Sequence, residues 1–291
     1  VCHIGKIRPL HGKGIRNIVA HVDRLSRKFE YCGQAWYQRE VVIPEEWEGR
    51  EIILSLERCH WETSVFVDGE PVATDERLST PNRFILTKQL TPGLHTLTLC
   101  VDNRLKYPMD QWNHGTTEYT QTNWNGVVGR MELIAKPFCY IGKMDIYPNL
   151  EAKKVKVRLA LHASGKPAKG ELTLRIREKA GKEVCRAVAS VSLSGKEDKI
   201  EQELVLGKDM KLWDEFSPAL YDLTATLATE AGEDIRSSVF GMRHVEQGLH
   251  HIRVNGRDIH LRGVLDCCVF PLTGYPATDV KEWKRIFHTV K

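Results

Sequence analysis

Apolar and polar residues alternate along most of this chain, as they do in strands that bury one face. The stretch 51–57, for example, places Ile52, Leu54 and Leu56 on one side. Turn residues such as Asp68-Gly69 separate these stretches at the short, regular spacing of an antiparallel sandwich. We therefore expect a first β-sandwich with strands at 36–43, 51–57, 63–67, 94–102 and 130–135.

A second series of alternating stretches follows a linker at Lys136-Pro137. Clusters of Gly, Ser and Lys at 164–166 and 194–196 separate them. An immunoglobulin-like sandwich needs about 100 residues holding roughly seven short strands, and this part of the chain offers both. The Cys…Trp…Cys pattern of antibody domains is missing, so we do not expect a true antibody-type domain. The expected strands are 155–161, 171–177, 184–193, 200–206 and 220–228.

The last part of the chain has a different pattern. Asn255-Gly256 predicts a hairpin turn, and the apolar run 259–265 predicts a strand. A helix is predicted from Asp279, its capping residue, to Lys291, with Glu282 in the position of a capping box. A strand followed by a helix opens a parallel α/β architecture and cannot bury its own faces, so we expect a further domain. The apolar stripe of the helix is Val280, Trp283, Ile286, Phe287 and Val290.

The composition argues against two classes of partner. The chain has 42 Lys and Arg against 38 Asp and Glu, a net charge of +4. Its densest basic run, 153–158, alternates with apolar residues and has no interleaved aromatics, as on the solvated face of a strand. No apolar run approaches the roughly 20 residues that span a bilayer. We therefore expect neither a nucleic acid nor a membrane partner.

The cysteines and histidines do not form a metal-binding pattern. The eight cysteines contain no C-x-x-C pair, and no Cys/His spacing suggests zinc. Several, such as Cys100, fall in strand patterns, so buried free thiols are expected. We expect no metal and no cofactor. The N-terminus is not a signal peptide and lacks Met, so localisation has to follow from function.

Between the expected strands of the first sandwich, residues 103–125 form a long polar and aromatic stretch. It is rich in Asn, Gln and Thr. Long segments of this kind on a rigid scaffold are usually functional or poorly ordered. Its aromatic and imidazole residues are Tyr107, Trp112, His114, Tyr119 and Trp124.

Six groups of short motifs stand in order along the chain. They are Ala35-Trp36-Tyr37-Gln38-Arg39 with Ile43-Pro44-Glu45-Glu46-Trp47; Phe66-Val67-Asp68-Gly69; Val101-Asp102-Asn103; Trp124-Asn125-Gly126-Val127-Val128-Gly129-Arg130; Leu212-Trp213, Ser217-Pro218 and Leu220-Tyr221 with Phe240-Gly241-Met242-Arg243; and Val254-Asn255-Gly256 with Leu261-Arg262-Gly263-Val264. Together they resemble the N-terminal part of family 2 glycoside hydrolases, the group of β-galactosidases, β-glucuronidases and β-mannosidases. Each motif alone is weak, but their order across almost the whole chain is specific.

The resemblance implies an all-β front end to a catalytic domain. It places a jelly-roll sugar-binding domain at 1–137, an immunoglobulin-like β-sandwich at 138–244, and the first strand and helix of a truncated (β/α)8 barrel at 245–291. Family members use two glutamates on barrel strands in a retaining mechanism, and both lie beyond this chain. The resemblance therefore implies no catalytic residue here, but a non-catalytic region of an enzyme that hydrolyses β-glycosidic bonds.

Candidate substrate-binding residues follow from the same resemblance. Aromatic faces and amides suit sugars, so the long stretch is expected to supply Asp110, Trp112, His114, Asn123, Trp124 and Asn125. Alternatively, Trp124 anchors the core and the Asn residues make turns. Asp266 follows the expected barrel strand, where residues face the active site, so it lines the sugar pocket or caps a strand end. It stands in Leu265-Asp266-Cys267-Cys268 where β-galactosidase-like members have Asn-Arg-His-Glu, so β-galactosidase specificity does not transfer.

A different class of function stays open at this stage. Two β-sandwiches also suit a stand-alone carbohydrate-binding or adhesion module, or a structural protein without a ligand. The terminal strand and helix argue against the binding module, because a finished binding module would not end on an unsupported amphipathic helix. A carbohydrate is the expected partner, and the family implies a periplasmic or secreted location. The sugar, the linkage and the question of a homo-oligomer stay open.

Overall fold

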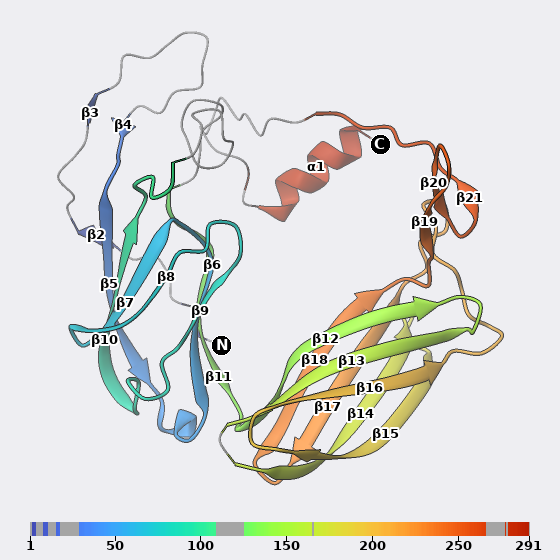
Figure 1. Ribbon diagram of the computed structural model, residues 1–291, viewed down its shortest axis with the longest axis horizontal. Helices are drawn as coiled ribbons and strands as arrows, with labels where there is room; N and C mark the ends of the chain where they lie inside the picture. The colour runs from blue at the N-terminus through green and yellow to red at the C-terminus, as the bar shows by residue number, and fades with distance from the viewer. Residues whose placement is uncertain are drawn as a thin grey trace. The chain divides into compact units, whose positions relative to one another are not determined.

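The computed structural model describes residues 2–3, 8–10, 16–17, 29–108, 125–164, 166–265, 277 and 279–290 (Figure 1). Strands dominate these residues, which confirms the expected all-β class, and α1 (Val280–Val290) is the only α-helix among them. That helix is too short and too polar to cross a membrane. The chain divides into two compact units, residues 1–48, 52–135 and 264–291, and residues 49–51 and 136–263.

The first unit contains two main sheets, ordered β1-β11-β6-β9 and β2-β5-β10-β7-β8, and a two-stranded sheet, β3-β4. The bounds are β1 (Cys2–His3), β2 (Arg8–Leu10), β3 (Arg16–Asn17), β4 (Phe29–Glu30), β5 (Gln34–Ile43), β6 (Glu51–His60), β7 (Glu62–Val67), β8 (Glu70–Asp75), β9 (Asn82–Ile85), β10 (Gly93–Asp102) and β11 (Gly126–Lys136). A short 3-10 turn, η1 (Glu45–Trp47), follows β5.

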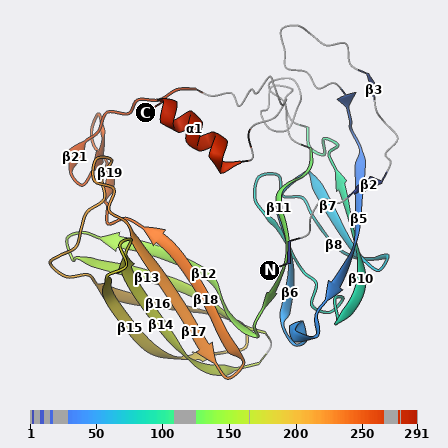
Figure 2. The same ribbon diagram turned by 180° about the vertical axis from the view of Figure 1, so that it is seen from behind.

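The two sheets of the first unit enclose one apolar core. Leu54 and Leu56 on β6 lie in the same buried cluster as Leu97 and Leu99 on β10. Figure 2 shows these strands from behind. The period-2 alternation of both strands therefore buries one face of each sheet against the other, as the sequence predicts.

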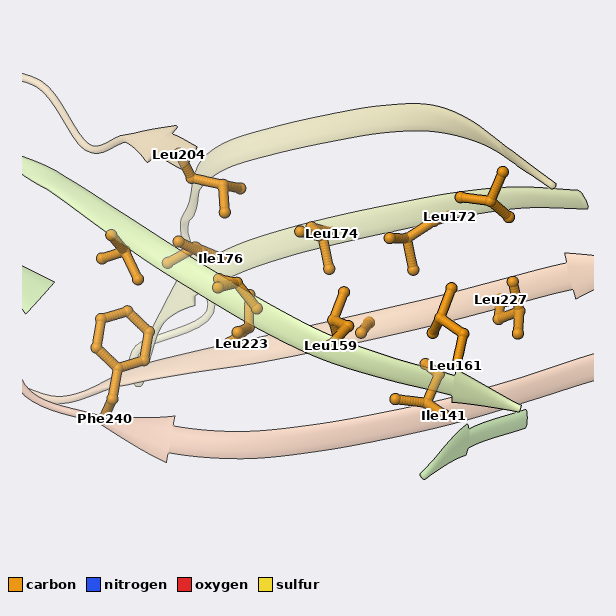
Figure 3. Close-up of a cluster of buried hydrophobic side chains, with 14 of the residues drawn as sticks. Ile141, Leu159, Leu161, Leu172, Leu174, Ile176, Leu204, Leu223, Leu227 and Phe240 are labelled. Atoms are coloured by element: carbon orange, nitrogen blue, oxygen red, sulfur yellow. The ribbon is translucent and has the colours of Figure 1, made fainter. Parts of the chain in front are cut away.

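The second unit is built in the same way from two further sheets, ordered β12-β13-β16 and β15-β14-β17-β18, with a small sheet β19-β20-β21 beside them. Figure 3 shows side chains of β13, such as Leu159 and Leu161, pointing toward Leu172 and Leu174 of β14. The bounds are β12 (Cys139–Asn149), β13 (Lys154–Ala163), β14 (Ala168–Glu178), β15 (Glu183–Leu193), β16 (Glu197–Val205), β17 (Tyr221–Thr229), β18 (Gly232–Phe240), β19 (Val245–Gln247), β20 (Ile252–Val254) and β21 (Arg257–Asp258).

Both predicted glycine turns form. Asp68 and Gly69 have φ of +53° and +88° and connect β7 to β8, and Asn255 and Gly256 have φ of +54° and +79° and connect β20 to β21. Two consecutive residues with positive φ are the geometry that Asn-Gly and Asp-Gly favour. The hairpin signals in the sequence are therefore confirmed.

The predicted strand at 259–265 is wrong: these residues form no regular element. A barrel strand is held by parallel neighbours on both sides, and none pairs with this run in the described part of the chain. The predicted helix is confirmed within one residue at each end, and the backbone N–H of Lys281 donates to Asp279 Oδ1 at 2.8 Å. Glu282 pairs with Arg285.

Two tryptophans of the first unit have different roles. Trp47 packs against the buried core cluster. Trp36 lies outside that cluster, because its neighbour Tyr37 takes the core-facing side of β5. Trp36 instead packs against Phe66, with the ring planes tilted by 39° and the centroids 5.5 Å apart.

Candidate functional site

Among the candidate substrate-binding residues, the structure describes Asn125. It directly precedes β11 and is half-buried, and its Oδ1 is shielded from solvent with no hydrogen-bond partner among the described residues. A buried amide oxygen without a donor costs about 1–3 kcal/mol, so other contacts must hold this segment in place. The remaining candidates, Asp110, Trp112, His114, Asn123, Trp124 and Asp266, lie outside the described residues.

The first of these contacts joins Gly126 to Tyr37. Tyr37 lies on β5 and Gly126 on β11, so the contact crosses between the two sheets of the first unit. Gly126 has a φ of +77°, and a Cβ built on it would lie 2.4 Å from the Tyr37 hydroxyl oxygen. Burial raises the pKa of Tyr37, and the nearby backbone N–H of Val127 opposes part of that rise.

The second contact lies three residues further along β11. Gly129 has a φ of +82°, and a Cβ built on it would lie 2.6 Å from a carboxylate oxygen of Glu57. Glu57 accepts the backbone N–H of Arg130 at 2.9 Å and its Nε–H at 3.2 Å. The backbone hydrogen bond from Arg130 is the main reason that the pKa of Glu57 is lowered.

The chain is also held where it leaves β10. The Asn103 side chain accepts the Gly33 N–H and donates to the Tyr31 carbonyl, both at 2.7 Å. Asp102 pairs with Arg104, whose side-chain hydrogen bonds lower the pKa of the Asp102 carboxyl. The Val101-Asp102-Asn103 motif therefore fixes the first residues after the strand.

An aromatic pair lies just beyond that point. Trp61 is buried and its Nε1 donates to the Glu76 carbonyl at 3.0 Å, while the Tyr107 hydroxyl donates to the Glu76 carboxylate at 2.6 Å. The two rings are 5.7 Å apart, and Tyr107 is 49% exposed. Lys106 pairs with Glu62, which raises the pKa of the lysine. An exposed aromatic ring beside carboxylate and ammonium groups can stack on a sugar ring and exchange hydrogen bonds with hydroxyls.

Sequence reasoning did not select Tyr37, Glu57, Trp61 or Glu76 as site residues. They lie on or between strands that are far from residue 125 in sequence, and no local spacing connects them. The signal that exists is indirect, because the two glycines of the 124–130 motif mark close approaches by other groups.

In the second unit, the matched motifs meet around Trp213. Its backbone N–H donates to the Met242 carbonyl at 2.9 Å, and its carbonyl accepts from Asn255 Nδ2 at 3.0 Å. The Arg243 guanidinium lies 4.5 Å from the centre of the indole ring. A Cβ on Gly241 would lie 2.7 Å from Trp213 Cβ, so only glycine fits there.

Asn255 connects the hairpin β20–β21 to this group. Its Oδ1 accepts the His244 N–H at 2.9 Å, and its own N–H donates to the His244 carbonyl at 2.9 Å. Arg257, on the other side of the turn, pairs with Glu215 and lies over the Phe216 ring. Three motifs that are separate in sequence therefore form one hydrogen-bonded structure.

The described residues contain no group of three or more His, Cys, Asp and Glu side chains placed to hold a metal ion. Free thiols are found at Cys32, Cys59, Cys100, Cys139 and Cys185. Burial raises the pKa of Cys59 to about 11, so this thiol stays protonated at neutral pH.

The fold and these contacts define a β-rich chain of two units in which strand-end motifs hold polar and aromatic segments. Residues 139–243 match the family model described as Glycosyl hydrolases family 2. The resemblance drawn from the motifs is confirmed: the chain is similar to the N-terminal region of family 2 glycoside hydrolases.

Two relatives show the extent of the similarity. A β-galactosidase of Aeromonas hydrophila is 27% identical over 244 residues, which are 78% of this chain and 22% of that protein. A β-glucuronidase of Rattus norvegicus is 23% identical over 80% of this chain and 39% of its own length. The chain therefore spans less than two fifths of these relatives.

The solved structures agree on the fold. The match to a β-glucuronidase of Bacteroides uniformis has a TM-score of 0.76 at 22% identity. It covers 89% of this chain and 32% of the β-glucuronidase. The match to β-glucuronidase 2 from the same organism has a TM-score of 0.79 at 20% identity. It covers 99% of this chain and 38% of β-glucuronidase 2. At these identities the likeness shows the arrangement of strands and leaves substrate choice open.

Proposed function

We propose that this chain is the non-catalytic N-terminal region of a family 2 glycoside hydrolase, an enzyme that hydrolyses β-glycosidic bonds with retention. The observation that carries the proposal is the family match at 139–243, on the unit in which the Trp213, Arg243 and Asn255 motifs meet. The curated relatives are named β-galactosidase and β-glucuronidase, and both names describe hydrolysis of a β-linked sugar.

In this proposal each part of the chain has a defined place. Residues 1–137 are a jelly-roll sugar-binding domain, 138–244 an immunoglobulin-like sandwich and 245–291 the start of a (β/α)8 barrel. The two-sheet cores of both units support the first two assignments. The barrel assignment rests on the motif resemblance and on α1, whose apolar stripe is largely exposed.

Catalysis belongs to two glutamates of the barrel, one acid/base and one nucleophile, about 5–5.5 Å apart. This chain contributes scaffold and part of the substrate surface. Asp110, Trp112, His114, Asn123, Trp124, Asn125 and Asp266 are the proposed sugar contacts. A periplasmic or secreted location is part of the same proposal.

The test compares this chain with the complete polypeptide that contains it, using p-nitrophenyl β-galactoside and β-glucuronide as substrates. We expect hydrolysis with retention from the complete polypeptide and only the uncatalysed rate from the chain. Hydrolysis by the chain alone contradicts the non-catalytic assignment. Failure of the complete polypeptide on a panel of β-glycosides contradicts the hydrolase assignment.

Calorimetric titration of this chain with the sugars of the same panel addresses the alternative. A scaffold that supplies part of a site should bind them weakly. Tight binding by the chain alone would favour a stand-alone carbohydrate-binding module.

A further inference from the structure

The segment from Gly126 to Arg130 is held twice by the same arrangement. In each case a glycine with positive φ is approached by a side chain from another strand, and the backbone N–H of the next residue interacts with that side chain. Tyr37 is the side chain for Gly126, and Glu57 is the side chain for Gly129.

The same arrangement occurs at both glycines. Glycine has the greatest backbone freedom of any residue. At both Gly126 and Gly129, a side chain from another strand occupies the space that a Cβ would take. Tyr37 reaches across from the opposite sheet, whereas Glu57 comes from β6 in the same sheet as β11. The segment is therefore fixed from two directions.

We propose that Tyr37 and Glu57 are positioning residues, which together set the path of residues 126–130 and so aim Asn125 at the substrate. The inference rests on the proposed function for its substrate, a β-linked sugar. Tyr37 acts on the backbone directly after Asn125, so the loss of its hydroxyl changes the direction of the Asn125 side chain most. Glu57 acts further along, so its loss has a smaller effect of the same kind.

The first arm of the test uses this chain and no sugar. In Tyr37→Phe we expect amide exchange of Val127 to rise about tenfold, with a shift of the Asn125 side-chain NH2 resonances. In Glu57→Gln the same rise is expected at Arg130. Tyr147→Phe and Glu203→Gln are matched controls on the second unit and should change neither readout. Unchanged exchange at both Val127 and Arg130 overturns the proposal.

The second arm uses the complete polypeptide and a p-nitrophenyl β-glycoside. We expect Tyr37→Phe to raise KM about fivefold while kcat changes less than about twofold, because the lost interaction serves binding. A merely structural role would leave KM unchanged and lower the amount of active enzyme. Altered exchange with an unchanged KM therefore overturns the positioning role.

The two arms also distinguish this inference from the proposed function. If the wild-type polypeptide hydrolyses no β-glycoside, the hydrolase assignment fails, and the dissociation constant of this chain for the free sugar takes the place of KM. Weaker binding by Tyr37→Phe than by Tyr147→Phe then supports the positioning role. Equal binding by the two variants overturns it.

Discussion

Asp234 on β18 accepts the backbone N–H of Ile141 on β12 at 2.9 Å, and so joins the two sheets of the second unit. From the same strand, Arg236 donates to the Gly142 carbonyl at 2.6 Å. The register of β12 against β13 shifts between Ile141 and Lys143. A bulge of this kind interrupts the regular ladder, and the two side chains of β18 bind the backbone groups at that point.

Replacing Asp234 by Ala should destabilise the second unit by about 2–4 kcal/mol. The change leaves the buried Ile141 N–H without its acceptor and removes the partner of Lys136 Nζ, which lies 3.0 Å from Oδ1. Urea unfolding of the chain, followed by the transition of the second unit, measures the loss.

Asp222→Ala is the matched control for this variant. Asp222 also pairs with a lysine at 3.0 Å, but both partners are exposed to solvent. Its loss should cost less than about 1 kcal/mol. Equal losses in the two variants would contradict the special role of Asp234.

The contact between Gly126 and Tyr37 predicts a coupling in stability. Gly126→Ala should lower the free energy of unfolding by about 1 kcal/mol because of the positive φ alone. The collision of the new Cβ with the Tyr37 hydroxyl should lower it further. Tyr37→Phe removes the oxygen at 2.4 Å and leaves the ring carbon at 3.5 Å, so the double variant should lose less than the sum. A double-mutant cycle by chemical denaturation measures this difference.

Gly69→Ala is the control for the coupling. Gly69 has a φ of +88°, but a Cβ there meets nothing within 4 Å. The loss of stability in Gly69→Ala should therefore simply add to the loss in Tyr37→Phe, without coupling. The collision is disproved if both glycines show the same additivity.

Sequence alternation predicts the strands whose inward residues are apolar, and it fails where that rule is reversed. On β18, Asp234 is buried while Ile235 and Val239 are 56% and 50% exposed. On β9, Asn82 is buried while Ile85 is 63% exposed. The inward face of each strand mixes a polar with an apolar residue, Asp234 with Phe240 and Asn82 with Phe84, so neither strand shows a uniformly apolar face in the sequence.

The candidate site is predictable to a similar degree. The composition of 103–125 predicts a functional stretch, which stays a prediction, and the glycines at 126 and 129 mark tight backbone positions. The partners Tyr37 and Glu57 are not recoverable in this way, because they approach from strands paired through the sheet topology. The run 259–265 shows the opposite limit: its apolar residues predict a strand, yet a strand forms only beside a partner.

His95 and Asp68 form a pair whose strength depends on pH. His95 Nδ1 lies 2.6 Å from Asp68 Oδ2, and Nε2 lies 2.8 Å from the Thr91 carbonyl. Both partners are acceptors, so the protonated imidazolium form of His95 satisfies both contacts at once. The hydrogen bond to Asp68 raises the pKa of His95 from 6.5, and the Thr96 N–H, followed by His95, lowers the pKa of Asp68 from 3.8.

The pair should stabilise the first unit most between about pH 4 and 6.5, the ordinary values of Asp and His. The His95 contribution is full below 6.5 and is lost as the pH rises through the raised pKa. The Asp68 contribution is full above 3.8 and is lost as the pH falls through the lowered pKa. The difference in Tm between wild type and His95→Gln should therefore be larger at pH 5.5 than at pH 8.5. A pH-independent difference would contradict the charged pair.

Asn82 is the residue at which a substitution should increase stability. It is fully buried opposite Leu56 in the β6–β9 ladder, and neither its Nδ2 nor its Oδ1 has a hydrogen-bond partner in the described part of the chain. Leucine has the same branching and the same number of side-chain heavy atoms as asparagine. Asn82→Leu should therefore stabilise the first unit by about 1–3 kcal/mol, because it removes two unpaired polar groups from an apolar core.

The same substitution at Asn149 provides the comparison. Asn149 is exposed, and its Oδ1 accepts the Ala152 N–H at 2.9 Å in the turn after β12. Asn149→Leu should therefore destabilise the second unit by about 1 kcal/mol. If unpaired buried polar groups destabilise the first unit, chemical denaturation should show a higher free energy of unfolding for Asn82→Leu and a lower one for Asn149→Leu. If Asn82→Leu also destabilises, the Asn82 amide is satisfied in solution by a buried water, and the unpaired state is not the native one.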